Sequence, residues 1–260
     1  MSTPTAAELR SVVHPEGLLD RRSGEHWAGR IYMRQISLQV TRRIVGTRVT
    51  PNGLTYMMIL AGIAAGAALI LPGIAGPLAA LILVQLYLLL DCVDGEVARW
   101  RRQTSVTGVY LDRVGHYLSE AALLSGAGLH AAGVLDGGGF NGYATLGVVA
   151  ALGAILIKSE TDLVDGARAK SGLPPVQDAA AVPRSSGAAS ARKLVASLKF
   201  HRLVGAVEAS IFLLLAGVLD LVADDGGLLY SRIAVGALAA IALLQTVLHL
   251  ISVLMSSRLR

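Results

Sequence analysis

Long apolar stretches separated by short polar breaks make up most of the chain. No charged residue occurs between Val49 and Leu90, and the glycines and prolines between Leu71 and Pro77 divide that stretch in two. A helix needs roughly 20 apolar residues to cross a bilayer, so each half is long enough to span one. The pattern predicts transmembrane helices at residues 53–71, 77–101, 108–134, 142–160, 203–222 and 232–255.

A different pattern precedes the first of these spans. Apolar residues recur there at helical spacing, with arginines between or opposite them: Met33, Ile36, Val40 and Ile44, and Arg30, Arg34, Arg42 and Arg43. This pattern predicts an amphipathic helix over residues 30–47 in the headgroup layer, and the alternative is an ordinary surface helix packed on the bundle.

The predicted fold class is therefore an all-α integral membrane protein with six transmembrane helices, preceded by an amphipathic juxtamembrane helix. Residues 1–29 form the N-terminal cytoplasmic segment, and residues 48–257 form the six-helix domain. Within that domain, residues 171–190 are rich in Pro, Ala and Ser, which predicts a mobile cytoplasmic loop.

Composition excludes several other classes of protein. The chain of 260 residues is 53% hydrophobic and 16% charged, whereas soluble proteins carry about 25% charged residues. A soluble enzyme and a disordered chain are thus excluded. The single cysteine, Cys92, excludes an intrachain disulfide and any multi-cysteine metal site.

The distribution of basic residues predicts the topology. If the N-terminus is inside, the outside loops are 72–76, 135–141 and 223–231, and none of them contains Lys or Arg. All of the 23 basic residues except Arg232, which begins the sixth span, then lie on the cytoplasmic side or in the cytoplasmic helix ends. The positive-inside rule therefore places both termini in the cytoplasm of a multi-pass cell-membrane protein. The net charge of +5 is explained by a membrane surface, and a nucleic-acid partner is not expected.

Acidic residues gather at the cytoplasmic ends of spans two and three. Asp91 and Asp94 lie three residues apart, and Asp112 and His116 lie four apart, so each pair shares a helix face. A carboxylate at membrane depth costs about 2.5–3.5 kcal/mol, so a cluster of them needs a compensating charge. A divalent cation such as Mg²⁺ or Mn²⁺ would supply it. The alternative is pairing of these acids with nearby arginines, namely Arg99, Arg101, Arg102 and Arg113.

The same region carries a spaced signature. It fixes seven residues over 22 positions: Asp91, Asp94, Gly95, Ala98, Arg99, Gly108 and Asp112. This arrangement resembles the signature of the CDP-alcohol phosphotransferase family. Residues 50–55 resemble the entry to the first transmembrane helix of that family, and the six-span layout agrees as well.

The resemblance implies a membrane transferase of phospholipid-type biosynthesis. It would move a phospho-alcohol group from a CDP-linked donor, such as CDP-diacylglycerol or another CDP-alcohol, to an acceptor hydroxyl and release CMP. The implied metal ligands for Mg²⁺ or Mn²⁺ are Asp91, Asp94 and Asp112. The residues implied to shape the nucleotide site are Asn52, Thr55, Gly95, Ala98 and Gly108. Arg99 is implied to stabilise the acidic surroundings of that site. Members of the family usually form homodimers.

One position departs from the family pattern. The family has a fourth aspartate four residues after the third, which binds metal and deprotonates the acceptor, and here that residue is His116. We expect His116 to serve as the general base, and it also stays a candidate metal ligand. Glu120 lies four residues further along the same helix stripe and is expected to orient the imidazole.

Two other classes of function stay open. The substitution at His116 would also suit a catalytically inactive relative that binds nucleotide or lipid. A cation transporter or a membrane prenyltransferase is a further alternative. If the chain is a transferase, basic residues near the ends of spans four and five are candidate ligands of a phosphorylated acceptor. Topology and anionic lipid also explain basic residues at these places. The candidates are Lys158, Arg168, Arg192, Lys193, His201 and Arg202.

Overall fold

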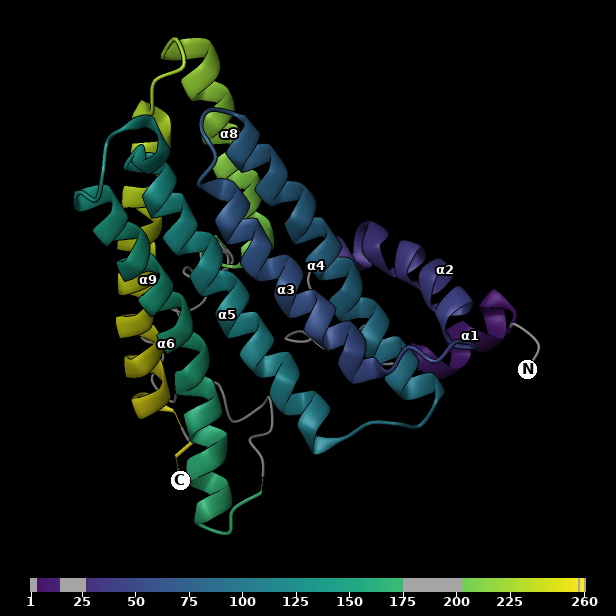
Figure 1. Ribbon diagram of the computed structural model, residues 1–260. Coiled ribbons are helices and arrows are strands. Elements are labelled where there is room, and N and C mark those ends of the chain that lie inside the picture. Colours follow the sequence, from purple (N-terminus) through teal and green to yellow (C-terminus); the bar gives the residue numbers. More distant parts are fainter. Residues whose placement is uncertain (1–3, 15–26, 175–202, 257, 260) are drawn as a thin grey trace. The chain divides into compact units, whose positions relative to one another are not determined.

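The computed structural model describes residues 4–14, 27–174, 203–256 and 258–259, and those residues contain helices and no strands. The helices before the first span are α1 (Ala6–Val13), the π-helical segment η1 (Gly29–Met33) and α2 (Arg34–Ile44). The later helices are α3 (Pro51–Leu69), α4 (Ala75–Trp100), α5 (Val106–Ala131), η2 (Val134–Asp136), α6 (Gly142–Lys170), α8 (Ala206–Ala223) and α9 (Leu229–Met255). Six of these elements are long and apolar enough to cross a membrane, so the predicted all-α, six-span fold class is confirmed (Figure 1).

The fourth span differs most from its predicted limits. The apolar pattern ends near residue 160, but α6 continues to Lys170. The helix stops where Gly172 adopts a φ of 70°, a left-handed conformation that favours glycine and ends helices. Hydropathy therefore marks the apolar part of α6, while the backbone of Gly172 determines its end. Beyond residue 174 the predicted mobile loop lies outside the described residues.

The chain forms two compact units, and α3, α4 and α5 contribute residues to both. The first unit contains the described residues of Met1–Ala65 and Ile82–Ser119, and the second contains those of Gly66–Leu81 and Glu120–Arg260. The predicted signature lies within the first unit.

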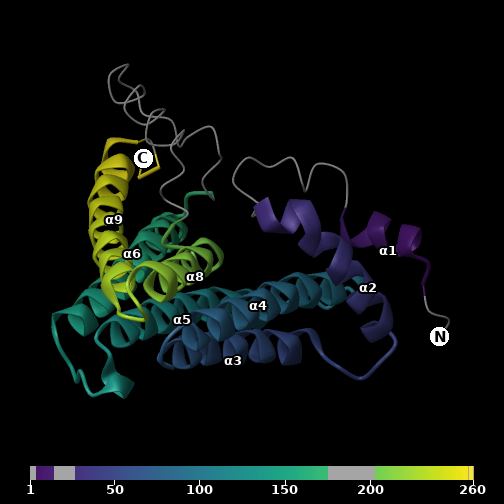
Figure 2. The same cartoon turned by 90° about the horizontal axis from the view of Figure 1, so that it is seen from above.

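In the first unit, α1 and α2 pack beside the C-terminal part of α4 (Figures 1 and 2). Leu9 and Val13 of α1 and Leu38 of α2 form a buried apolar cluster, against which Trp100 packs. Thr5 begins α1 with a capping box, because its hydroxyl accepts from the backbone N–H of Glu8 and the Glu8 carboxylate accepts from the backbone N–H of Thr5. These contacts fix the N-terminal helix against the signature helix α4.

The predicted amphipathic helix is present as η1 followed by α2. Its buried side consists of Ser37, Leu38 and Thr41, whereas Ile36 on its apolar stripe is 47% exposed. The two hydroxyl residues are buried because they bind a carboxylate of α4, which is described below. Of the other stripe residues, Met33 is buried and Val40 and Ile44 are partly buried, so only Ile36 presents an apolar side chain freely to the headgroup layer and that location stays a prediction.

In the second unit, α9 packs against both α6 and α8. Close approach of α5 and α6 requires glycine, because a Cβ on Gly147 would lie 2.6 Å from the Cα of Gly128. Asp220 of α8 is buried, and its carboxylate accepts from the backbone N–H groups of Tyr230 and Ser231 at 2.6 and 3.0 Å. This buried acid therefore caps the start of α9.

Candidate functional site

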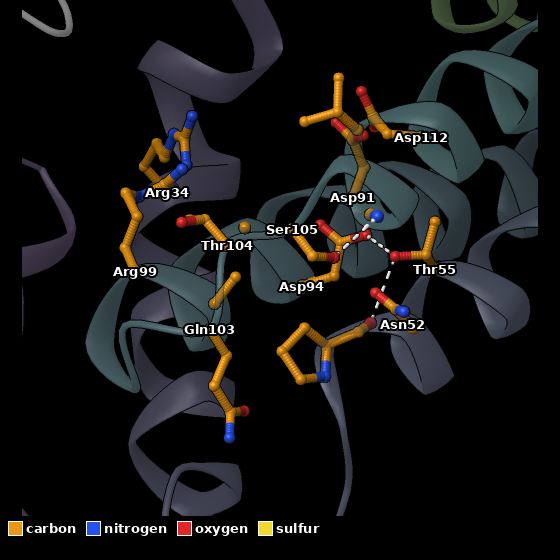
Figure 3. A pocket seen from close by; sticks show the side chains of 15 residues that line it. Arg34, Asn52, Thr55, Asp91, Asp94, Arg99, Gln103, Thr104, Ser105 and Asp112 are labelled. Atoms are coloured by element: carbon orange, nitrogen blue, oxygen red, sulfur yellow. Dashed lines mark hydrogen bonds between the residues drawn. The ribbon is translucent and has the colours of Figure 1, made fainter.

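A pocket of about 320 Å³ lies in the first unit, where the start of α3, the C-terminal part of α4 and the start of α5 meet (Figure 3). This volume is at the lower end of the range for small-molecule sites. The pocket collects the acids Asp91, Asp94 and Asp112. It also collects every residue that the sequence assigned to the nucleotide: Asn52, Thr55, Gly95, Ala98, Arg99 and Gly108.

Local capping fixes the two helix starts that border the pocket. The hydroxyl of Thr50 accepts from the backbone N–H of Gly53 at 3.1 Å, directly before Pro51 begins α3. Ser105 accepts in the same way from Gly108 at 3.0 Å and caps α5. A Cβ on Gly108 would lie 3.3 Å from Oδ1 of Asn52, so the glycine keeps space open between α5 and α3.

Three of the four predicted metal ligands converge. One ligand atom from each of Asp91, Asp112 and His116 lies within 4.8 Å of the others. The Nε2 atom of His116 is 3.4 Å from Oδ1 of Asp91 and 3.6 Å from Oδ1 of Asp112. The three side chains are 25–41% exposed, so a solute can reach them. Two carboxylates beside an imidazole form a donor set that fits a divalent cation.

Asp94, the fourth predicted ligand, faces a different partner. It is 8% exposed, and its Oδ2 accepts a 2.5 Å hydrogen bond from the hydroxyl of Thr55. Thr55 thus links α3 to the carboxylate of α4, and because it also lines the pocket, its predicted contact with the nucleotide stays a prediction. Asp94 still borders the pocket, so its role as a metal ligand stays a prediction.

The arginine-pairing alternative is weakened by the contacts of two of its candidates. Arg101 donates to the backbone carbonyls of the segment that follows α2, namely Ile44, Val45, Thr47 and Val49. Arg99 donates from Nε to the carbonyl of Val13 at 2.9 Å. These donors hold the N-terminal region to α4, and the acid cluster retains the features of a cation site.

His116 has a neighbour that the sequence did not single out. The hydroxyl of Tyr87 on α4 forms a hydrogen bond with Nδ1 of His116, and the rings meet edge to face. Tyr87 precedes Asp91 by one helical turn, so the four-residue spacing would have identified it. Glu120, which was expected to orient His116, has Lys158 as a partner, with Nζ donating to Oε1 at 2.8 Å. Its effect on His116 stays a prediction.

The other basic residues proposed for an acceptor are only partly described. Arg168 donates to the backbone carbonyls of Pro174 and Arg258 at 2.8 and 2.9 Å, which closes the end of α6. The remaining candidates lie outside the described residues: Arg192, Lys193, His201 and Arg202.

Comparison with known families bears on the resemblance that the signature carries. Residues 48–135 match the family model described as CDP-alcohol phosphatidyltransferase. This segment of the chain is therefore similar to that family. The matched segment contains α3, α4 and α5 with every residue of the signature, and it confirms the resemblance that those residues carried.

Two curated relatives match part of this chain. Each is a "Bifunctional IPC transferase and DIPP synthase": the protein of Thermococcus kodakarensis is 37% identical over 92 residues, and that of Aquifex aeolicus is 33% identical over 108 residues. The alignments cover 35% and 41% of this chain but only 20% and 24% of those proteins. The chain thus corresponds to about a quarter or less of the relatives it matches.

Solved structures agree at the level of the fold. The phosphatidylinositol phosphate synthase of Mycobacterium tuberculosis, crystallised with CDP-DAG bound, has a TM-score of 0.54 at 18% identity, covering 86% of this chain and 96% of that one. Its apo form gives 0.53 at 16% identity, covering 85% and 98%. The fold similarity extends well beyond the segment matched by the family.

Proposed function

We propose that this protein transfers a phospho-alcohol group from a CDP-linked donor to an acceptor hydroxyl and releases CMP. The observation that carries the proposal is the pocket, where the three carboxylates and all six predicted nucleotide residues meet. The family match supports the donor class, as does the CDP-DAG bound to the structural relative. In the proposed reaction the acceptor oxygen bonds to the phosphorus that carries the alcohol. The bond from that phosphorus to the CMP oxygen breaks, and the hydroxyl proton passes to a base.

The acid cluster would hold the divalent cation. Carboxylate oxygens suit Mg²⁺ and Mn²⁺, and an imidazole favours Mn²⁺ over Mg²⁺. Asp91 and Asp112 would bind it, with Asp94 and His116 as further candidates, because those residues border the pocket or belong to the converging group. When bound, such a cation offsets the negative charge of the diphosphate and of the departing CMP.

His116 is proposed as the general base. Its Nδ1 is engaged by Tyr87, which orients the ring and leaves Nε2 directed toward the two carboxylates. An imidazole nitrogen with an available lone pair can take the hydroxyl proton near neutral pH. The same Nε2 cannot bind a metal and accept a proton at once, so the base role and the ligand role at that atom exclude each other.

The setting of the reaction is proposed from the sequence. The six apolar helices indicate a multi-pass membrane protein. The positive-inside pattern supports cytoplasmic termini with the pocket near the cytoplasmic face. A homodimer and a role in phospholipid biosynthesis are proposed from the family resemblance. A phosphorylated acceptor is proposed from the basic residues near the ends of spans four and five.

The decisive experiment is release of CMP from a CDP-linked donor. Purified protein in lipid is supplied with Mn²⁺ or Mg²⁺, CDP-diacylglycerol or a water-soluble CDP-alcohol, and a panel of hydroxyl acceptors that includes sugar and polyol phosphates. Acceptor-dependent CMP release in the parent, and its loss in Asp91→Asn with Asp112→Asn, is expected. CDP binding without release from any donor would favour the inactive relative, and cation flux into vesicles without CMP release would favour a transporter.

A further inference from the structure

Glu96, which follows the signature residue Gly95, is fully buried and accepts hydrogen bonds from two segments remote in sequence. Ser37 donates to its Oε1 and Thr41 to its Oε2, both at 2.6 Å. His14 Nε2 lies 2.9 Å from Oε1. Arg34 Nη1 approaches the same oxygen at 3.4 Å. A buried carboxylate is costly unless it is paired and hydrogen-bonded, and here both oxygens are satisfied.

Arg34 connects this buried group to the pocket. Its side chain is 21% exposed and lines the pocket, while its Nη1 contacts both Glu96 and His14 at 3.4 Å. Figure 3 shows Arg34 beside Arg99 at one side of the pocket, opposite Asp91 and Asp112. Two neighbouring cations at a pocket wall require structural support, which the buried carboxylate supplies.

Arg99 is supported from the same direction. Its Nε donates to the carbonyl of Val13, the residue before His14. Val13 is fully buried with Leu9 and Leu38, so α1 cannot move away without opening an apolar cluster. The end of α1 therefore holds both arginines of the pocket, one through a carbonyl and the other through the histidine and Glu96.

Resting on the proposed function, we propose that Arg34 binds a phosphate group of the substrate, and that Glu96 and His14 are the residues that position it. A guanidinium recognises phosphate through several charge-assisted N–H bonds, provided that its plane is held in place. Contacts of Nη1 with Glu96 and His14 hold it, and the pocket gives access to a bound anion. The phosphate belongs either to the CDP-linked donor or to a phosphorylated acceptor, and the two sources give different kinetic results.

The test compares Arg34→Gln with Arg43→Gln. Arg43 lies on the same helix, is exposed and donates to the carbonyl of Gln39, so it serves as a matched control for the loss of a cation. Binding of CDP, CMP and cytidine is measured with Mn²⁺ present, and the KM for each acceptor is measured by CMP release. Loss of a charge-assisted bond to phosphate is expected to weaken binding about 10- to 100-fold in Arg34→Gln and not in Arg43→Gln.

The affinity pattern identifies the source of the phosphate. Weaker CDP binding with unchanged cytidine binding assigns the contact to the donor. Unchanged CDP binding with a raised KM for phosphorylated acceptors, but not for acceptors without phosphate, assigns it to the acceptor. If Arg34→Gln matches Arg43→Gln in both measurements, the inference is wrong while CDP binding by the parent still supports the proposed function. If the parent neither binds CDP nor releases CMP, the proposed function itself fails.

The positioning role is tested by a double-mutant cycle. Glu96→Gln and the milder His14→Gln should each raise the same dissociation constant or KM that Arg34→Gln raises. In combination with Arg34→Gln they should add almost nothing, because the contact they support is already gone. Full additivity would show that Glu96 and His14 act on affinity independently of Arg34, and a fall in melting temperature with no change in phosphate affinity would assign them to stability alone; either result overturns the positioning role.

Discussion

The Nε2 atom of His116 on α5 lies 3.4 Å from Oδ1 of Asp91 on α4. The residue that departs from the family signature thus remains inside the acid cluster instead of turning away from it. Tyr87 fixes the other nitrogen of the ring from α4. An imidazole held in this way can carry out proton transfer in the place where the family pattern has a carboxylate.

Metal dependence is the first consequence that can be measured. A cation present at about 100 times its dissociation constant stabilises the folded protein by about 2.7 kcal/mol, and tenfold weaker binding reduces that gain to about 1.4 kcal/mol. We expect at least such a reduction in Asp91→Asn and in Asp112→Asn, because each loses a charged oxygen ligand. Thermal unfolding in Mn²⁺ against EDTA measures it.

Asp136→Asn, in an exposed segment of the second unit, is the control and should retain the full metal-dependent shift. Asp94→Asn tests whether Asp94 binds the cation or only accepts the hydrogen bond of Thr55. If Asp94 is a ligand, this variant should also lose part of the Mn²⁺-dependent shift. A full Mn²⁺ shift in all three cluster variants, Asp91→Asn, Asp94→Asn and Asp112→Asn, would contradict the assignment of a cation site.

Nucleotide binding should depend on the two pocket glycines. A Cβ on Gly95 would lie 3.1 Å from Nη1 of Arg99, and one on Gly108 would lie 3.2 Å from Oγ of Ser105. Leucine at either position places further atoms in the pocket, so we expect steric exclusion of CDP and at least roughly tenfold weaker CDP binding, which corresponds to about 1.4 kcal/mol. Gly166→Leu, at a helical position with open space around it, is the matched control. Wild-type CDP affinity in both pocket variants would place the nucleotide elsewhere.

The base assignment predicts separate effects on binding and on chemistry. His116→Ala should lower CMP release by about 10²–10⁴-fold, the usual contribution of a general base, and leave CDP affinity unchanged. His116→Asp should retain transfer, because it restores the carboxylate that the family pattern has at this position. Rates measured across pH 4–8 test both variants.

Glu120→Gln should slow transfer less than His116→Ala. Lys158→Met is measured beside it, because Lys158 is the ion-pair partner of Glu120 and its loss removes the same ion pair. Equal slowing in these two variants would assign the effect to the ion pair rather than to the imidazole. If His116→Ala transfers as fast as the parent, or if only His116→Asp is active, His116 is not the base.

The predicted topology can be tested by labelling introduced cysteines. The native Cys92 is buried and is first replaced by serine. Phe140, which is 84% exposed between α5 and α6, and Ser171 at the end of α6 are then changed to cysteine one at a time. With cytoplasmic termini, a membrane-impermeant maleimide should label Phe140→Cys in intact cells and Ser171→Cys only after permeabilisation. The reverse pattern would invert the topology.

The sequence by itself determined the six apolar helices and the residues of the pocket. Hydropathy is a local property, so the spans followed from composition, and helical periodicity placed Asp91 with Asp94 and Asp112 with His116. The resemblance to the family named the residues of the site in advance. The six nucleotide candidates line the pocket together with the three acids: Asn52, Thr55, Gly95, Ala98, Arg99 and Gly108 with Asp91, Asp94 and Asp112.

Only the tertiary structure decided which partners the polar side chains take. His14 and Arg34 reach Glu96 from 82 and 62 residues away, and Lys158 reaches Glu120 from 38 residues away. Such pairs have no periodic signal in a single sequence, because they depend on how separate helices pack. A buried carboxylate must accept hydrogen bonds, so its partners are the donors that helix packing places beside it.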